Sequence, residues 1–117
     1  MPIQRLRIEK RYSDIVNHNG TVYLAGQLAD DYDGDAAEQT RQTLANIDRA
    51  LAEAGSDKSK ILSVTVYLKD IDADYASLNQ VWDAWVAEGA SPARACVEGK
   101  LYDPRALVEM TVIAAQN

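Results

Sequence analysis

Six stretches of the chain have the alternation of apolar and polar residues, or the β-branched and aromatic composition, that is typical of β-strands. We expect strands at residues 3–8, 14–17, 21–25, 61–69, 95–100 and 107–114, with Gly26 ending the third. Asn19-Gly20 lies between the second and third strands and is the strongest short hairpin signal, because both residues tolerate a positive φ.

The fourth predicted strand has two different faces. One face is apolar and the other is polar or aromatic: Leu62, Val64, Val66 and Leu68 against Ser63, Thr65, Tyr67 and Lys69. We expect helices to cover the apolar face, and solvent or another subunit to meet the semi-polar one.

A first helix is predicted over residues 35–54, where Thr40, Leu44, Ile47, Leu51 and Ala54 recur at spacings of four and three. Asp35 and Glu38 form a capping-box-like start, in which side chains satisfy free N–H groups. Gly55 is a natural C′ stop.

A second helix is predicted over residues 74–88, with an apolar stripe of Tyr75, Leu78, Trp82, Trp85 and Val86. We interpret the tryptophan pair as core, because aromatic side chains bury a large area. The resulting order, β-β-β-α-β-α-β-β, predicts an α+β fold: a two-layer mixed β-sheet with two helices on one face, in a single domain spanning residues 1–117. The sequence does not fix the strand order.

Charge and composition exclude several functions. The formal net charge of -6 disfavours nucleic acid as a partner, since affinity for phosphate comes from clustered Lys and Arg. The basic residues near the N-terminus (Arg5, Arg7, Lys10 and Arg11) have the pattern of a solvated strand edge. One cysteine, Cys96, and one histidine, His18, cannot form a Cys- or His-rich metal site. Without a signal peptide or a membrane-length apolar run, we expect a cytoplasmic protein with no membrane partner.

Five ordered segments resemble the RidA (YjgF) family: residues 25–27, 66–70, 74–79, 92–98 and 107–110. The resemblance covers nearly the whole chain. It implies the chorismate-mutase-like fold and a homotrimer in which three sheets form a barrel-like centre, with active sites in clefts between subunits. It also implies hydrolytic deamination of reactive enamines and imines, such as 2-aminoacrylate, to 2-keto acids and ammonia. No cofactor and no metal are implied.

The resemblance assigns a catalytic pair. Arg94 matches the arginine that binds the substrate carboxylate, and a guanidinium fits a carboxylate bidentately. Glu109 matches the glutamate that holds the hydrolytic water, and it can move a proton if burial raises its pKa. From the residues alone, a surface salt bridge for Arg94 and a subunit-boundary ion pair for Glu109 stay open.

Four further residues match substrate-binding positions: Tyr12, Gly26, Asn79 and Cys96. No histidine lies near Cys96 in the sequence, so we expect a buried, inert thiol. Gly26 is better explained by a close backbone approach or a bulge than by direct chemistry. Asn79 is equally compatible with an ordinary polar helix position.

The chain departs from the family pattern at three places: Ala25 replaces a serine, Leu101 replaces an arginine, and the turn proline comes one position later, as Pro104. The missing hydroxyl at Ala25 motivates an alternative, a non-catalytic module that binds or senses small carboxylates or keto acids in the intersubunit cleft. An endoribonuclease or translational-inhibitor role also attaches to the family, but the acidic charge argues against it.

Overall fold

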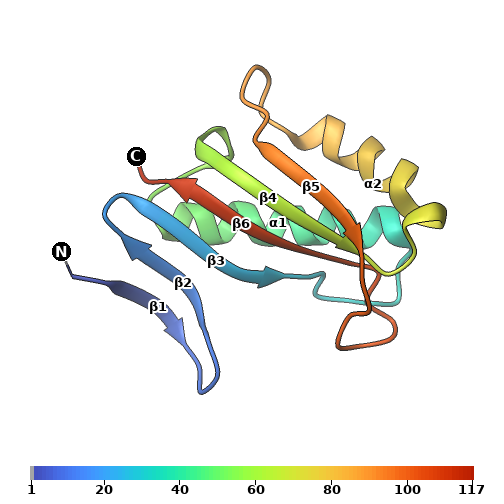
Figure 1. Cartoon of the computed structure of the whole chain (residues 1–117), viewed down its shortest axis with the longest axis horizontal. Coiled ribbons are helices and arrows are strands. Elements are labelled where there is room, and N and C mark those ends of the chain that lie inside the picture. Colours follow the sequence, from blue (N-terminus) through green and yellow to red (C-terminus); the bar gives the residue numbers. More distant parts are fainter. Residues whose placement is uncertain (1) are drawn as a thin grey trace.

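The computed structural model describes residues 2–117 and forms one mixed sheet with two helices. The elements are β1 (Gln4–Ile8), β2 (Ser13–His18), β3 (Thr21–Gln27), α1 (Ala36–Glu53), a 3-10 turn η1 (Lys58–Lys60), β4 (Ile61–Leu68), α2 (Ile71–Trp85), β5 (Ala93–Glu98) and β6 (Val108–Ala115). The spatial strand order is β1-β2-β3-β6-β4-β5, and only β4 and β5 run parallel (Figure 1). The predicted element order and α+β class are confirmed.

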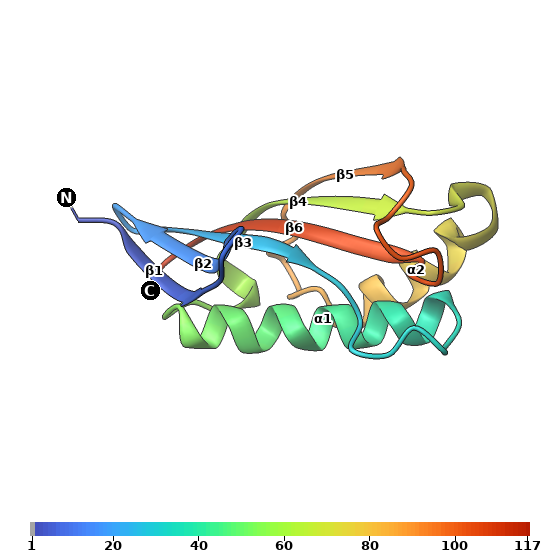
Figure 2. The same ribbon diagram turned by 90° about the horizontal axis from the view of Figure 1, so that it is seen from below.

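Both helices pack against the same face of the sheet (Figure 2). The core lies between these two layers and consists of buried residues from strands and helices, including Ile15, Val22, Leu44, Ile47, Leu51, Val66, Leu78, Val108, Met110 and Val112. Burying each such side chain stabilises the fold by about 1.5–3 kcal/mol. The opposite face carries no helix, and exposed apolar side chains such as Tyr23, Val97 and Ile113 lie on it.

The predicted hairpin between β2 and β3 is confirmed. His18 pairs with Thr21, and the two residues between them have φ values of 53° at Asn19 and 79° at Gly20. Two positive φ angles match the right-handed twist of the flanking strands.

The predicted ends of the first helix are also confirmed. The Asp35 side chain accepts a hydrogen bond from the Glu38 amide at 2.9 Å. Gly55 has a φ of 79°, and the amides of Gly55 and Ser56 donate to the carbonyls of Ala52 and Leu51, which is a Schellman arrangement.

The predicted second helix, residues 74–88, is wrong by three residues at both ends, since α2 spans Ile71–Trp85. Asp70, not Asp74, is the N-cap, and its carboxylate accepts from the Ala73 amide at 3.1 Å. The Glu98 side chain adds a cap from β5 by accepting from the Ile71 amide. Of the predicted stripe, Trp82 is buried and Trp85 packs at the edge of the core, whereas Tyr75 is 43% exposed.

Strand ends differ from the predicted ones by one or two residues, and two differences move side chains. A register shift between Ile61 and Ser63 buries Ile61 and leaves Leu62 52% exposed, so Leu62 does not belong to the core face. Strand β3 does not end at Gly26 but continues to Gln27 through a bulge opposite β6.

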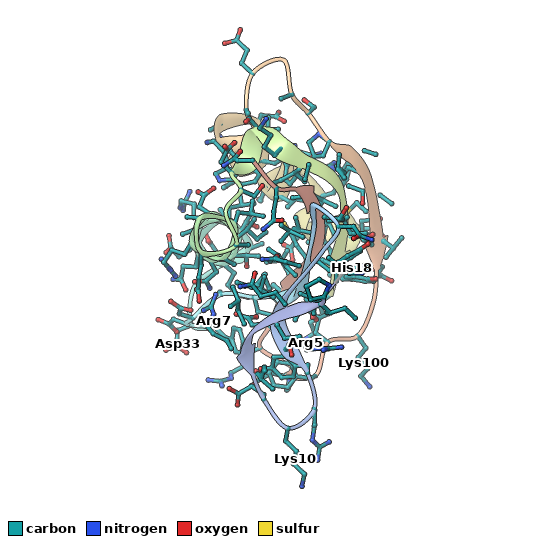
Figure 3. All side chains as sticks on the ribbon, turned by 90° about the vertical axis from the view of Figure 1, so that its left-hand side faces the viewer. Arg5, Arg7, Lys10, His18, Asp33 and Lys100 are labelled. Atoms are coloured by element: carbon teal, nitrogen blue, oxygen red, sulfur yellow. The ribbon has the colours of Figure 1, made fainter. Side chains whose placement is uncertain are left out.

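The basic N-terminal segment lies on β1, an edge strand, as the sequence predicts. Arg7 also links this edge to the helical layer, since its guanidinium is 3.1 Å from the carboxylates of both Asp14 and Glu53. Figure 3 shows Arg7 on the side of α1, whereas Lys10 projects from the β1–β2 connection. Exposed charge on an edge strand disfavours pairing with other chains.

Candidate functional site

Arg94 lies on the helix-covered side of β5. It pairs with Val64 of β4, a core residue, and neighbouring residues of paired strands point to the same face. Strand β5 is the last strand of the sheet, and the helix that contacts this side chain is α2.

Three residues of α2 hold the Arg94 guanidinium. Its Nη2 donates to Oδ1 of Asn79 at 2.8 Å and lies 3.5 Å from the Tyr75 hydroxyl. Its Cζ is 5.0 Å from the centre of the Trp82 ring, a cation–π contact that fixes the plane of the guanidinium. These contacts position Arg94 without neutralising its charge.

Within residues 2–117, no acidic side chain lies within salt-bridge distance of Arg94. The surface salt bridge that the sequence left open for Arg94 is therefore not formed within one chain. Nη1 of Arg94 is buried without a hydrogen-bond partner. Buried N–H groups are normally paired, so the guanidinium keeps an unused donor that an incoming oxygen acceptor would satisfy.

Arg94 lines an open recess of about 430 Å³ together with Ile71, Asp72, Tyr75 and Cys96. Burial raises the pKa of the Cys96 thiol, and the nearby Arg94 charge opposes this only in part. The thiol is therefore protonated at neutral pH. His18 cannot activate it, because β3, β6 and β4 separate the strand of His18 from β5.

Glu109 lies on the other face of the sheet. Its neighbours Val108 and Met110 are buried in the core, and Glu109 pairs with Tyr67 on the helix-free side. Burial raises the pKa of the Glu109 carboxyl. No cation within the described chain forms an ion pair with it.

Glu109 lines a second recess, of about 540 Å³, with Tyr12, Ala25, Gly26, Leu28 and Tyr102. Gly26 sits in the β3 bulge, directly against Glu109. A Cβ at this position would overlap Oε2 of Glu109 and lie 3.0 Å from its Cδ. The predicted role of Gly26, a close approach at a bulge, is what the structure gives.

The six predicted residues thus fall into two groups on opposite faces of one sheet. Arg94, Asn79 and Cys96 form one group, with Asn79 acting as a hydrogen-bond partner of Arg94. Tyr12, Gly26 and Glu109 form the other. A small molecule bound to one chain cannot contact both Arg94 and Glu109.

Sequence reasoning missed three residues at these recesses. Tyr75 and Trp82 were interpreted as core stripe, yet both contact Arg94. Tyr102 was not assigned to any site, yet it lines the Glu109 recess. The only available signal was composition: Tyr102 lies in a short loop among charged residues, where an aromatic ring has little to pack against.

Two classes of site are not formed by the described part of the chain. Residues 2–117 hold no group of three or more His, Cys, Asp or Glu side chains placed to bind a metal ion. Neither of the helices described here has the length and apolarity needed to cross a membrane.

The sequence and the fold are similar to those of known proteins. The model of the family described as endoribonuclease L-PSP matches residues 2–116. The RutC family protein YoaB of Escherichia coli K12 is 45% identical over 115 residues, which cover 98% of this chain and 99% of the relative. A crystal structure of a YjgF family protein from Neisseria meningitidis has a TM-score of 0.96 and 47% identity, covering 100% of this chain and 97% of that one. A crystal structure of a protein from Pseudomonas aeruginosa has a TM-score of 0.95 and 50% identity, covering 99% of this chain and 100% of that one.

These matches define a class of small α+β proteins with one six-stranded sheet covered by helices on a single face. The chain belongs to the YjgF/RidA family.

Proposed function

We propose that this protein hydrolyses reactive enamines and imines, such as 2-aminoacrylate, to 2-keto acids and ammonia in clefts between the subunits of a homotrimer. One observation carries the proposal: Arg94 is held in a recess with an unused donor and no acidic partner. A guanidinium with a free donor and no acidic partner is suited to a planar oxyanion such as a substrate carboxylate.

Arg94 anchors the substrate. The contacts with Asn79 and Trp82 fix its guanidinium before the ligand arrives, so less conformational freedom is lost on binding. An anchored carboxylate places the adjacent imine carbon at a defined distance from the hydrolytic water, and such positioning lowers the barrier.

Glu109 binds the water and moves the proton. An enamine such as 2-aminoacrylate first takes a proton from solvent at its β-carbon, which gives the iminium. Water then attacks the iminium carbon and forms the C–O bond while the π-electrons of C=N move to nitrogen, and Glu109 takes the proton that the water loses. Glu109 then returns this proton to the nitrogen. The C–N bond breaks as the C=O bond forms, ammonia leaves, and the hydroxyl proton passes to solvent. A carboxyl pKa raised by burial brings the base closer to neutral pH.

Two copies of the chain are needed for this chemistry, since Arg94 and Glu109 lie on opposite faces of the sheet in each copy. The exposed apolar side chains of the helix-free face, Tyr23, Val97 and Ile113, favour contact with further copies. In such an assembly, the Glu109 recess of one subunit meets the Arg94 recess of the next.

The first test is the Arg94→Ala variant. 2-Aminoacrylate is generated in situ by a pyridoxal-phosphate lyase, and pyruvate release is followed with parent, variant or no protein. We expect the parent to accelerate release and the variant to lose at least about 2 kcal/mol of transition-state binding, roughly 30-fold or more in kcat/KM. Equal rates for parent and variant would contradict the anchor.

The absence of a hydroxyl at Ala25 in the Glu109 recess favours one second candidate, a keto-acid binding module. The same assay separates the two. Calorimetric binding of pyruvate without any turnover would support the module, and detectable turnover would remove it.

The family description also names an endoribonuclease. With a net charge of -6, and the Asp72 carboxylate lining the same recess as Arg94, this chain has little to attract a polyanion. We therefore do not assign RNA as a substrate.

A further inference from the structure

Tyr102 is a solvent-exposed aromatic side chain in the same recess as the Glu109 carboxylate. It lies in the loop between β5 and β6, is 77% exposed, and lines the Glu109 recess. We infer that Tyr102 contacts the ligand, donating a hydrogen bond from its hydroxyl at the Glu109 end of the cleft, and that Tyr32 is the positioning residue that orients this hydroxyl. The identity of the reaction rests on the proposed function, but the contact itself is tested by binding.

The two tyrosines form a pair across two loops. Their hydroxyl oxygens are 2.9 Å apart, and their rings meet edge to face with centroids 6.4 Å apart. Burial, followed by the hydrogen bond to Tyr102, raises the pKa of the Tyr32 hydroxyl, so Tyr32 stays protonated. Either hydroxyl can donate in this pair, and when Tyr32 is the donor, the Tyr102 oxygen is the acceptor. The hydrogen of the Tyr102 hydroxyl is then free for a partner in the recess.

Gln39, a fully buried residue of α1, holds the two loops of the tyrosine pair in place. Its Nε2 donates to the carbonyls of Tyr32, Gly34 and Arg105 at 3.0–3.1 Å, and its Oε1 accepts from the Leu107 amide at 2.9 Å. One side chain therefore ties the Tyr32 loop to the Tyr102 loop.

Charged groups reinforce the same junction. The Arg105 guanidinium lies 5.7 Å from the centre of the Tyr32 ring and donates to the Asp103 carboxylate, whose pKa it lowers. Lys69 donates to the Pro104 carbonyl. Tyr102 is thus exposed yet held by a fixed loop, as a preorganised binding group should be.

The Glu109 recess has few side-chain hydrogen-bond donors, and Tyr102 is one of them. An ionised Glu109 only accepts hydrogen bonds, and Ala25, Gly26 and Leu28 offer no side-chain donor. A keto acid, or the oxygen added during hydrolysis, needs a donor at this end. Among the lining residues, only Tyr102 and Tyr12 carry one, and only Tyr102 has a second tyrosine to orient it.

The test compares Tyr102→Phe, Tyr32→Phe and the double variant with the parent. Pyruvate binding is measured by calorimetry and 2-aminoacrylate turnover by pyruvate release. We expect Tyr102→Phe to weaken pyruvate binding and lower kcat/KM about threefold to tenfold, the value of one hydrogen bond. Tyr32→Phe should act about twofold in the same direction, and the double variant should match Tyr102→Phe, because both changes remove one interaction.

The control is Ser91→Ala, which removes an exposed hydroxyl outside both recesses. It should bind pyruvate like the parent, and all variants should keep the parent's size in solution and its Tm to within about 2 °C. If the parent binds pyruvate and Tyr102→Phe binds it equally well, the inference fails while the proposed function stands. A parent that neither binds pyruvate nor turns over the enamine overturns both.

Discussion

Arg94 and Glu109 are defined by their surroundings more than by their residue types. The guanidinium is clamped by a ring and an amide from α2, which precedes it in the chain, and it meets no carboxylate. The carboxylate of Glu109 is set between buried neighbours and pressed against a glycine. Each group is thereby available for an external partner.

Gly26 gives a prediction at this scale. In Gly26→Ala, the new Cβ must displace the Glu109 carboxylate, so kcat/KM for 2-aminoacrylate should fall about 100-fold, the usual effect of a 1 Å misplacement. Gly99→Ala is the control, because a Cβ there meets nothing closer than 3.9 Å. Unchanged turnover in Gly26→Ala would show that the position of Glu109 does not matter.

The sequence could indicate some of these residues and not others. The bulge at Gly26 was predictable because a glycine inside a strand pattern needs such a reason. The contact between Asn79 and Arg94 was not, because it depends on how α2 lies across β5. Tyr75 has helical spacing like that of a core residue, and only the packing of the helix shows that it is half exposed.

At the scale of elements, capping residues predicted a helix end correctly where only one candidate was present. Asp35 and Gly55 were the single candidates for the two ends of α1, and both ends lie where they were predicted. Asp70, Asp72 and Asp74 are all of the residue type that caps helices, and Asp70 is the one that does so. The distant residue Glu98, which accepts from the Ile71 amide, also caps this end and could not be found from local sequence. Register also escapes local patterns: the shift in β4 exchanges the burial of Ile61 and Leu62.

Gln39 gives a prediction for the connections between elements. Gln39→Leu leaves three carbonyls and the Leu107 amide without their partner in a buried place, so we expect the free energy of unfolding in urea to fall by about 3 kcal/mol or more. Gln80→Leu makes the same chemical change on an exposed position of α2 and should shift it by less than about 0.5 kcal/mol. Equal stabilities of the two variants would refute the role of Gln39 as a tie between loops.

At the scale of the whole molecule, the sheet separates the two halves of the site. A helix-covered face holds the Arg94 recess and a helix-free face holds the Glu109 recess. The alternation within each strand could have shown which residues share a face, but not that β5 and β6 present their functional groups to opposite sides. That relation depends on the strand order, which the sequence left open.

The most direct test of a site shared between copies is complementation. Arg94→Ala and Glu109→Gln should each be inactive alone, whereas co-expressed subunits with different tags should assemble into mixed trimers. In a trimer that contains both variants, one interface of the three, about a third, joins an intact Arg94 to an intact Glu109. We expect purified mixed trimers to regain roughly that fraction of the parent's deaminase activity. Mixed trimers that form and stay as inactive as either variant alone would contradict it.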